Sequence, residues 1–360
     1  MSALRYSQLR DQEHLLFIRD ALKRLPDSCA GFIRAIEPTT TCLTRSAYVR
    51  DLTLFFRFLT AEIPRFGGLD PAAFTDADLD AVTADHIARF IEYLSLYLRL
   101  DQSIETNGQL GKMRKLSTLR SYFDYMFKNS KISKNTAQLI SLPKLHEKPI
   151  LRLELDEMAR MLDAADDGQA LTDRQQAWHA RTRERDLAML TLFLGTGIRV
   201  SECVGLDIED LDFEINGFLV SRKGGNQSIL YFPDEVASTL RQYLAVREAI
   251  EPLPGHERAL FLSLQRRRMT VRAVENMVKK YAAVAAPLKK RLSPHKLRST
   301  FGTNLYRETG DIYLVADVLG HSDVNTTRKH YAAMSDDLKR RAAQSVRLRD
   351  EAPKPPDGGR

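Results

Sequence analysis

One stretch of this 360-residue chain has the pattern of a β-hairpin, and that stretch limits the fold more than any other feature. Two short runs of mainly apolar residues, at 218–222 and 228–232, flank the turn-forming sequence Lys-Gly-Gly-Asn at 223–226. On both sides of the hairpin, apolar residues recur at the spacing of helices, for example over 48–59 and 183–194. The sequence therefore predicts a mainly α-helical protein with one small β-sheet in its second half.

A proline-containing segment near the middle of the sequence divides the chain into two parts. Residues 142–149 contain two prolines and several charged side chains, and they have little periodicity. We interpret 142–150 as a linker between a helical N-terminal domain, 1–141, and an α+β second domain, 151–347. The last residues, 348–360, are rich in proline, glycine and charge, so we expect them to be disordered.

Positive charge is concentrated in two blocks. The whole chain has a net charge of +7, but residues 112–150 alone carry nine basic side chains against two acidic ones. Residues 265–298 carry eleven basic side chains against Glu275 alone. Such concentration is typical of proteins that bind a polyphosphate such as DNA, because each neutralised phosphate releases counterions. The alternative is that each block forms an ordinary solvated helix face.

Several common catalytic and metal-binding signatures are missing from the sequence. It contains no GxxxxGK[ST], HExxH, GxSxG or GxGxxG motif, and its eight histidines do not have the spacing of metal-ligand pairs. The cysteines, Cys29, Cys42 and Cys203, lie far apart, which argues against a disulfide scaffold and a cysteine-based zinc site. No apolar run reaches the roughly 20 residues that a membrane helix needs. We therefore expect a cytoplasmic protein that uses no metal and no cofactor.

Cationic and imidazole side chains stand instead at the boundaries of the expected elements. Arg199 follows Gly-Thr-Gly at 195–197, where one expected helix ends and the next begins. A Ser-Pro pair at 293–294 marks the start of another helix, which places His295 and Arg298 on one face near its N-terminus. The free N–H groups and the dipole at such a terminus favour an anion.

Three further side chains continue this series along the chain. Lys223 lies in the glycine-rich turn of the expected hairpin, and His321 directly follows Gly320, which ends a helix expected over 311–319. Tyr331 lies on a short polar helix expected over 325–333. Taken singly, each residue has an ordinary alternative, because such arginines pair with acids, such histidines cap helices and most tyrosines pack in cores or at their rims.

In their order and context, these residues resemble the tyrosine recombinase (phage integrase) family. The motifs that carry the resemblance are TGIRVSE at 196–202, the Lys223 turn, HKLR at 295–298, LGHSD at 319–323 and Tyr331. The sequence over 195–206 and 310–333 is most similar to Xer-type recombinases, particularly the single-protein, XerS-like kind. The spacing from His321 to Tyr331 is ten residues, where nine is usual; His330 occupies the usual place, and no other tyrosine is near.

The resemblance implies an enzyme that cuts and rejoins DNA through a 3′-phosphotyrosyl bond, without metal or ATP. The implied catalytic residues are Arg199, Lys223, His295, Arg298, His321 and Tyr331. The tyrosine would be the nucleophile, the two arginines would stabilise the phosphorane-like transition state, and the lysine would be the general acid. The histidines would orient phosphate oxygens and help to deprotonate the tyrosine. Glu202 is expected to hold His295 or Arg199 in place.

The resemblance also implies a fold and partners. The expected fold is a two-domain clamp, in which a helical core-binding domain and an α+β catalytic domain close around double-stranded DNA at a specific recombination site. The expected assembly is a homotetramer on two DNA sites, with a DNA translocase as a candidate partner and no membrane. The charged helix expected over 335–347 is placed to dock on a neighbouring subunit.

Direct DNA contacts are expected from both basic blocks. The phosphate contacts predicted in the N-terminal domain are Lys112, Arg114, Lys115, Lys128, Lys131 and Lys134. Base-edge contacts are expected from a basic helix over 266–280, in which we rank four residues equally: Arg266, Arg267, Arg268 and Arg272.

Three functions are compatible with these residues. The first is site-specific recombination, either in chromosome-dimer resolution, which serves chromosome partition and cell division, or in DNA integration and excision by a mobile element. The second is the same chemistry with another outcome, as in a type IB topoisomerase or a hairpin telomere resolvase. The third is a DNA-binding homologue that has lost catalysis. The Xer-like motif context argues against the second function, and the complete six-residue set argues against the third.

Overall fold

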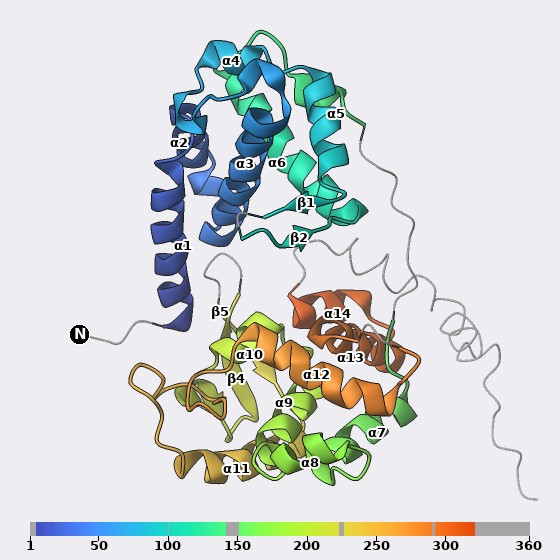
Figure 1. Cartoon of the computed structure of the whole chain (residues 1–360). Helices are drawn as coiled ribbons and strands as arrows, with labels where there is room; N and C mark the ends of the chain where they lie inside the picture. Colours follow the sequence, from blue (N-terminus) through green and yellow to red (C-terminus); the bar gives the residue numbers. More distant parts are fainter. Residues whose placement is uncertain (1–4, 100, 142–150, 223–226, 290–291, 321–360) are drawn as a thin grey trace, which may run out of the picture. The chain divides into compact units, whose positions relative to one another are not determined.

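The computed structural model describes residues 5–99, 101–141, 151–222, 227–289 and 292–320 (Figure 1). The chain forms two compact units, Met1–Lys148 and Pro149–Arg360, which we call the N-terminal and the C-terminal unit. The boundary between them falls inside 142–150, the segment interpreted as a linker, whose residues lie outside the described part.

The N-terminal unit is helical. Its helices are α1 (Tyr6–Leu22), α2 (Asp27–Ala35), α3 (Cys42–Glu62), α4 (Asp76–Asp80), α5 (Ala84–Tyr93) and α6 (Gln109–Lys128). Short 3-10 helices lie at Glu37–Thr39, Pro64–Phe66, Pro71–Ala73 and Thr136–Leu139. Between α5 and α6, β1 (Tyr97–Leu98) and β2 (Ile104–Glu105) pair antiparallel, which the sequence did not predict.

Aromatic side chains fill the centre of the N-terminal unit. Those that are at most 1% exposed include Phe55, Phe56, Phe90, Tyr122 and Phe123. Phe55 of α3 meets Phe90 of α5 and Phe123 of α6 edge to face, with ring centroids 5.2 and 6.2 Å apart. Because Tyr122 and Phe123 are anchored in this core, α6 is fixed in place while much of its other face carries charged side chains.

The C-terminal unit combines helices with a small sheet. Its helices are α7 (Leu155–Asp166), α8 (Asp173–His179), α9 (Arg183–Thr196), α10 (Val200–Gly205), α11 (Asp234–Glu248), α12 (Val271–Ala285), α13 (Pro294–Thr309) and α14 (Ile312–Leu319), with a 3-10 turn at Ile208–Asp210. The strands, in sheet order, are β3 (Leu211–Asp212), β4 (Gly217–Ser221) and β5 (Gln227–Tyr231), and both pairings are antiparallel. The predicted fold class, mainly α with a small sheet in the second half, is confirmed.

Helix α9 is central to the C-terminal unit. Every residue from Ala188 to Leu194 is buried, so this part of the helix has no solvent-facing side. It packs against α7, α11 and α13, which supply the apolar neighbours that such a helix requires. This packing holds the C-terminal end of α9, from which the chain continues to Arg199.

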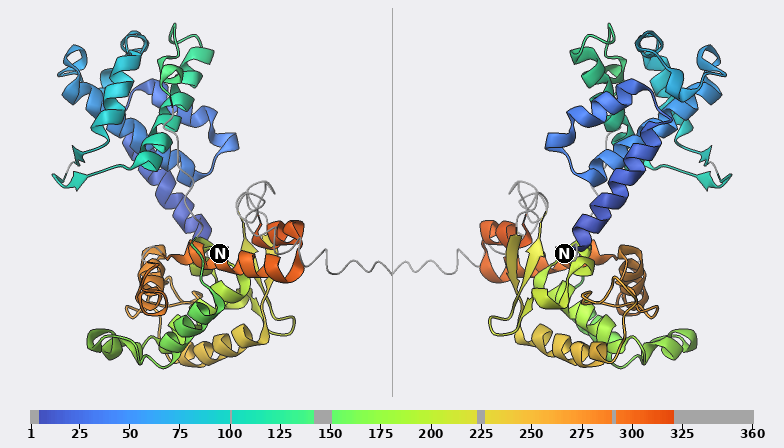
Figure 2. Two further views of the ribbon diagram at one scale, coloured as in Figure 1. Left: turned by 90° about the vertical axis from the view of Figure 1, so that its right-hand side faces the viewer. Right: turned by 90° about the vertical axis from the view of Figure 1, so that its left-hand side faces the viewer.

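The predicted hairpin is confirmed, with each strand beginning one residue earlier than expected. Strands β4 and β5 pair in register, from Gly217 opposite Tyr231 to Ser221 opposite Gln227. Arg222 directly follows β4 and is the last described residue before 223–226. Figure 2 shows the yellow strands of this hairpin beside the red-orange α14, and Arg222 is hydrogen-bonded to that helix.

The basic helix predicted from residue 266 begins later, at Val271. Thr270 caps it, because its hydroxyl oxygen accepts the N–H of Ala273 at 3.2 Å. The preceding loop contains 266–268, and there Arg268 pairs with Leu262 in an isolated antiparallel bridge. The prediction of a continuous helix over 266–280 was wrong because the basic run ends at a helix cap and does not continue through it.

Candidate active site

The end of α9 is shaped by a glycine that no other residue can replace without a shift in structure. Gly197 has a left-handed φ of 63° and terminates the helix. A Cβ built on it would lie 2.4 Å from Cδ1 of Phe301. The chain therefore turns sharply here, and Arg199 follows as the N-cap residue of α10.

Arg199 is held by Glu202 through both its backbone and its side chain. The Glu202 carboxylate accepts the N–H of Arg199 at 3.0 Å and its Nη1 at 2.8 Å. The Glu202 side chain is only 7% exposed, whereas that of Arg199 is 34% exposed. Of the two partners expected for Glu202, Arg199 is thus directly bound, and a buried acid orients a partly exposed guanidinium.

Arg298 reaches from α13 to two other segments. Ser293 and Pro294 start this helix as the sequence predicts, with the proline at the first helical position. Arg298 lies one turn later and is 5% exposed. Its Nη1 donates to the carbonyl of Gly197 at 2.6 Å, and its Nη2 donates to the carbonyl of Leu319. It therefore joins the loop after α9 to the end of α14.

The end of α14 is where the two predicted catalytic arginines meet. The helix is capped at its start by Asp311 and ends at Gly320, which has a left-handed φ of 58°. Arg298 binds the carbonyl of Leu319, and Nη2 of Arg199 donates to the carbonyl of Gly320 at 2.8 Å. Both contacts satisfy carbonyl groups at the negative end of the helix dipole.

A third arginine, which the sequence reasoning missed, joins this group. Nη2 of Arg222 donates to the carbonyl of Val318 at 2.9 Å, and its Nη1 donates to the carbonyl of Asp317 at 3.3 Å. The one signal in the sequence is its position directly before Lys223, in a basic pair that precedes the glycine turn.

The three guanidiniums gather positive charge at the end of α14, beside the Glu202 carboxylate. Burial lowers the pKa of Arg222, Glu202 partly offsets that shift, and Arg199 adds to it. An anion bound beside these arginines would relieve their mutual repulsion. Guanidinium forks that donate to carbonyl oxygens can equally donate to phosphate oxygens, and they stay charged at any working pH. The geometry thus suits the binding of a phosphate whose negative charge increases during a reaction.

The remaining predicted catalytic residues are distributed as follows. His295 is exposed on the first turn of α13, one turn before Arg298. Lys223, His321 and Tyr331 lie outside the described residues, as does the helix expected over 335–347. Along the chain, Lys223 directly follows Arg222, and His321 directly follows Gly320, so both continue from segments that meet at the end of α14.

The predicted phosphate contacts of the N-terminal unit lie on and after α6, and most are tied to neighbouring groups. The pairs are Lys112 with Ser95, Arg114 with Asp51, Lys115 with Asn107, Lys128 with Asp124 and Lys131 with Asp76, while Lys134 is exposed. Arg114 is the best fixed of them, because both Asp51 oxygens accept its guanidinium at 2.6 Å. Asp51 is buried and also accepts the Thr118 hydroxyl at 2.8 Å.

Arg114 and Lys115 border a pocket of about 500 Å³ whose lining contains further basic side chains. These are Arg50 and Arg57 of α3, together with Arg99 between β1 and β2. These three arginines were not predicted as phosphate contacts, because they lie outside the basic block 112–150. The seven-residue spacing of Arg50 and Arg57, which places both on one helix face, is the signal that could have identified them.

The four arginines ranked equally for base contacts are not equivalent in the structure. Arg272, on the first turn of α12, has a 74% exposed side chain, and Arg266 and Arg267 are also exposed. The side chain of Arg268 is only 9% exposed. It donates to the carbonyls of Val204 and Leu206 and forms an ion pair with Asp207. The equal ranking therefore does not hold, because Arg268 is bound inside the unit.

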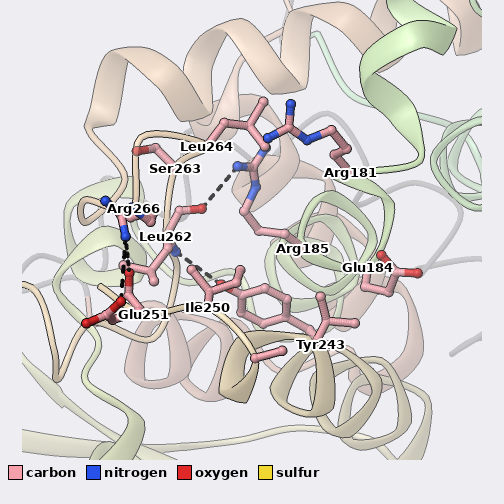
Figure 3. Close-up of a pocket in the computed structure, with 12 residues that line it drawn as sticks. Arg181, Glu184, Arg185, Tyr243, Ile250, Glu251, Leu262, Ser263, Leu264 and Arg266 are labelled. Carbon is pink, nitrogen blue, oxygen red and sulfur yellow. Dashed lines mark hydrogen bonds and ion pairs between the residues drawn. The ribbon is translucent and has the colours of Figure 1, made fainter. Parts of the chain in front are cut away.

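Other basic side chains of 265–298 also form ion pairs within the C-terminal unit. Lys280 pairs with the buried Asp186 at 3.1 Å, and Lys289 pairs with Glu157. Arg266 lies at the edge of a pocket of about 660 Å³, where it contacts Glu251, on the opposite side from Arg181 (Figure 3). None of the three arginines at the end of α14 lines this pocket.

The described ranges offer neither a metal site nor a membrane-spanning helix. Among those residues, no group of three or more His, Cys, Asp or Glu side chains is placed to hold a metal ion. No helix within the same ranges has the length and apolar character that crossing a membrane requires.

Comparison with known proteins gives matches along most of the chain. Residues 152–337 match the model of the phage integrase family. The tyrosine recombinase XerC of Caldanaerobacter subterraneus subsp. tengcongensis is 33% identical over 324 residues, which cover 89% of this chain and 84% of that protein. The tyrosine recombinase XerS of Streptococcus pyogenes is 31% identical over 290 residues, which cover 73% of this chain and 81% of that protein.

A solved structure has the same fold. The XerH site-specific recombinase, bound to a palindromic difH substrate in a post-cleavage complex, matches with a TM-score of 0.59 and 20% sequence identity. The match covers 84% of this chain and 80% of that one.

Proposed function

Because this chain belongs to the phage integrase family of tyrosine recombinases, we propose that it is a Xer-like enzyme that resolves chromosome dimers. Enzymes of this family cut and rejoin DNA, so tyrosine-type site-specific recombination is the activity of this chain. The narrower role in chromosome-dimer resolution is supported by the XerS-like sequence over 195–206 and 310–333 and by the 33% identity to XerC.

The observation that carries the proposed chemistry is the meeting of Arg199 and Arg298 at the end of α14. A phosphodiester under attack gains negative charge on its non-bridging oxygens. Donors that are already oriented when this charge develops lower the barrier, because they need no rearrangement at that moment. In our proposal, the two guanidiniums bind these oxygens, and Glu202 keeps Arg199 oriented through the bonds described above.

We assign the other catalytic roles by position in the sequence. Tyr331 attacks the phosphorus atom and forms a 3′-phosphotyrosyl bond, while Lys223 gives a proton to the 5′-oxygen that leaves. A phenol has an ordinary pKa of about 10, so His295 and His321 help to remove its proton. The phosphotyrosyl bond keeps the energy of the broken linkage, and a 5′-hydroxyl from the partner strand can therefore rejoin the DNA without ATP.

The proposed partner is double-stranded DNA that contains a specific site, which would place the protein in the cytoplasm. The cations of α6, together with those around the pocket beside Arg114, would contact phosphates and so position the duplex without reading its sequence. The exposed Arg266, Arg267 and Arg272 would contact base edges. The proposed assembly remains a clamp around DNA and a homotetramer on two sites, with a translocase as a candidate partner.

One assay separates the candidate activities. The protein is incubated with duplex DNA and a chelator of divalent metals, and covalent protein–DNA products are separated on a denaturing gel. A covalent product at one sequence supports the proposal, whereas relaxation of supercoiled DNA without sequence choice would assign a topoisomerase. Absence of any covalent product would assign a DNA-binding homologue without catalysis.

Mapping the bound sequence then tests the narrower role. Nuclease digestion of chromosomal DNA in the presence of the Tyr331→Phe variant should reveal the sequence that the protein protects. A single protected site in the host chromosome, outside any mobile element, supports chromosome-dimer resolution. Protected sites at the ends of a mobile element would assign an integrase or excisionase.

A further inference from the structure

The last carbonyl groups of α14 are bound by arginines from three different parts of the C-terminal unit. The pairs are Arg222 with Asp317 and Val318, Arg298 with Leu319, and Arg199 with Gly320. A helix end exposes carbonyl groups with partial negative charge, which cations satisfy. Two of these arginines belong to the predicted catalytic set, and Arg222 does not.

Arg222 and Gly320 lie in very close contact. The guanidinium of Arg222, at Nη1 and Cζ, occupies the space that a Cβ on Gly320 would need. No larger residue can therefore occupy position 320 while Arg222 keeps its place. The carbonyl of the same glycine accepts Nη2 of Arg199 at 2.8 Å. Arg199 thus binds Gly320 and Arg222 lies against it, and of the two only Arg199 is predicted to act on DNA.

The described hydrogen bonds of Arg222 all go to α14. Its Nη1 and Nη2 bind the carbonyls of Asp317 and Val318, and its Nε is buried without a partner among the described residues. The side chain is half-buried, and that burial opposes its charge. A guanidinium kept in such a place, whose hydrogen bonds within the described ranges all go to one helix end, acts on the position of that helix end.

We propose that Arg222 is a positioning residue for the arginines that bind the DNA phosphate. It holds the last turn of α14 against the end of β4, and so it sets where the carbonyls of Leu319 and Gly320 lie. Those carbonyls orient Arg298 and Arg199. The inference rests on the proposed function, in which these two arginines stabilise the phosphate, and Arg222 acts through them.

The contact itself is tested by a cycle of variants that uses a matched glycine. Gly310 also ends a helix in the left-handed conformation, with φ of 67°, but nothing lies within 4 Å of its Cβ position. Gly310→Ala should lower the melting temperature of the unit by about 2–4 °C, through backbone strain alone. Gly320→Ala should lower it further, because the new methyl group displaces the guanidinium of Arg222 from the carbonyls of Asp317 and Val318. The single tryptophan, Trp178, reports unfolding of this unit in the full chain.

The decisive variant of the cycle is Arg222→Ala combined with Gly320→Ala. Removal of the arginine takes away the three atoms nearest to the new methyl group. In the Arg222→Ala background, Gly320→Ala should then lower the melting temperature by no more than Gly310→Ala does. If Gly320→Ala costs the same with and without Arg222, the close contact does not exist and the inference is overturned.

The catalytic part is tested by comparing the rate of covalent product formation at saturating protein with DNA affinity. Arg222→Met should slow this rate at least tenfold and leave the dissociation constant for DNA within twofold. Arg222→Lys should be nearly as slow, because an ammonium group cannot replace a planar fork that binds two carbonyls. Gly310→Ala should react at the wild-type rate.

Two results would overturn the positioning role. One is a wild-type rate of covalent product formation for Arg222→Met. The other is a wild-type rate for Arg222→Lys together with a slow rate for Arg222→Met, because this result would mean that only the positive charge of Arg222 matters. A wild-type chain that forms no covalent product would instead overturn the proposed function. The melting-temperature cycle at Gly320 would still decide whether Arg222 holds the end of α14.

Discussion

Replacing Glu202 tests whether Arg199 must be held in place to act. The bond from the N–H of Arg199 caps α10, and such a cap contributes about 1 kcal/mol. The ion pair contributes about 1 kcal/mol, a low value because the Arg199 side chain is 34% exposed and solvent screens it. We therefore expect Glu202→Ala to lower the free energy of unfolding by about 2 kcal/mol. Glu202→Gln keeps an acceptor for the N–H and should lose about 1 kcal/mol.

Glu157 provides the matched control for this variant. It occupies the same position in the first turn of α7, where its carboxylate accepts the N–H of Glu154 at 2.8 Å and pairs with Lys289. Glu157→Ala should therefore lower the stability of the same unit by a similar amount. It disturbs a helix cap and an ion pair but removes no support from Arg199.

The effect on catalysis should separate the two glutamates. With Glu202→Ala, the rate of covalent product formation at saturating protein should fall at least tenfold, which corresponds to about 1.4 kcal/mol of transition-state stabilisation. DNA affinity should stay within twofold, because the charge of Arg199 remains. Glu157→Ala should keep the wild-type rate at a temperature where both variants are folded. Equal rates for the two variants would mean that Glu202 does not support Arg199 in catalysis.

Three further predictions follow from burial and backbone conformation. Gly197→Ala should lower the free energy of unfolding by at least about 2 kcal/mol, because alanine is strained in the left-handed conformation and its methyl group would also collide with Phe301. Gly255→Ala has the same backbone strain without a collision and should lose about 1 kcal/mol. Urea unfolding measures both losses. At pH 8 a thiol reagent should label Cys42 quickly and the other two cysteines only after unfolding, because burial raises the pKa of Cys29 to about 12 and raises that of Cys203 as well. Rapid labelling of a second thiol would contradict this. Arg268→Ala should destabilise the C-terminal unit by about 2 kcal/mol, because the carbonyls of Val204 and Leu206 lose a donor while Asp207 keeps its ion pair with Arg258. Arg272→Ala should instead weaken DNA binding at unchanged stability.

The parts of the site that the sequence predicted are those with local signals. A glycine after a helix indicates where that helix ends, as at Gly197 and Gly320, and a proline at the first helical position indicates where a helix begins, as at Pro294. These signals placed Arg199 and Arg298 at the correct element boundaries. The hairpin was predictable for the same reason, because its turn residues and its strands are adjacent in the sequence.

The parts that the sequence could not predict depend on contacts between distant segments. Arg222 meets α14 only because β4 lies beside that helix, and no periodic pattern encodes this contact. Arg268 is one of three consecutive arginines, and the sequence gives no reason to distinguish it from the other two. Its side chain is nevertheless buried, because it binds the carbonyls of Val204 and Leu206 and the carboxylate of Asp207. Strands β1 and β2 have only two residues each, too few for an alternating pattern.

In the proposed reaction, the hydroxyl of Tyr331 displaces a 5′-oxygen from a DNA phosphate bound by Arg199 and Arg298. Its most direct test is mass spectrometry of the protein after incubation with site-containing DNA in the presence of a metal chelator, followed by nuclease and protease digestion. We expect one modified peptide, with a nucleotide joined through its 3′-phosphate to Tyr331, and no such peptide from Tyr331→Phe. A nucleotide joined to any other residue, or strand cleavage that requires divalent metal and leaves the protein unmodified, would contradict it.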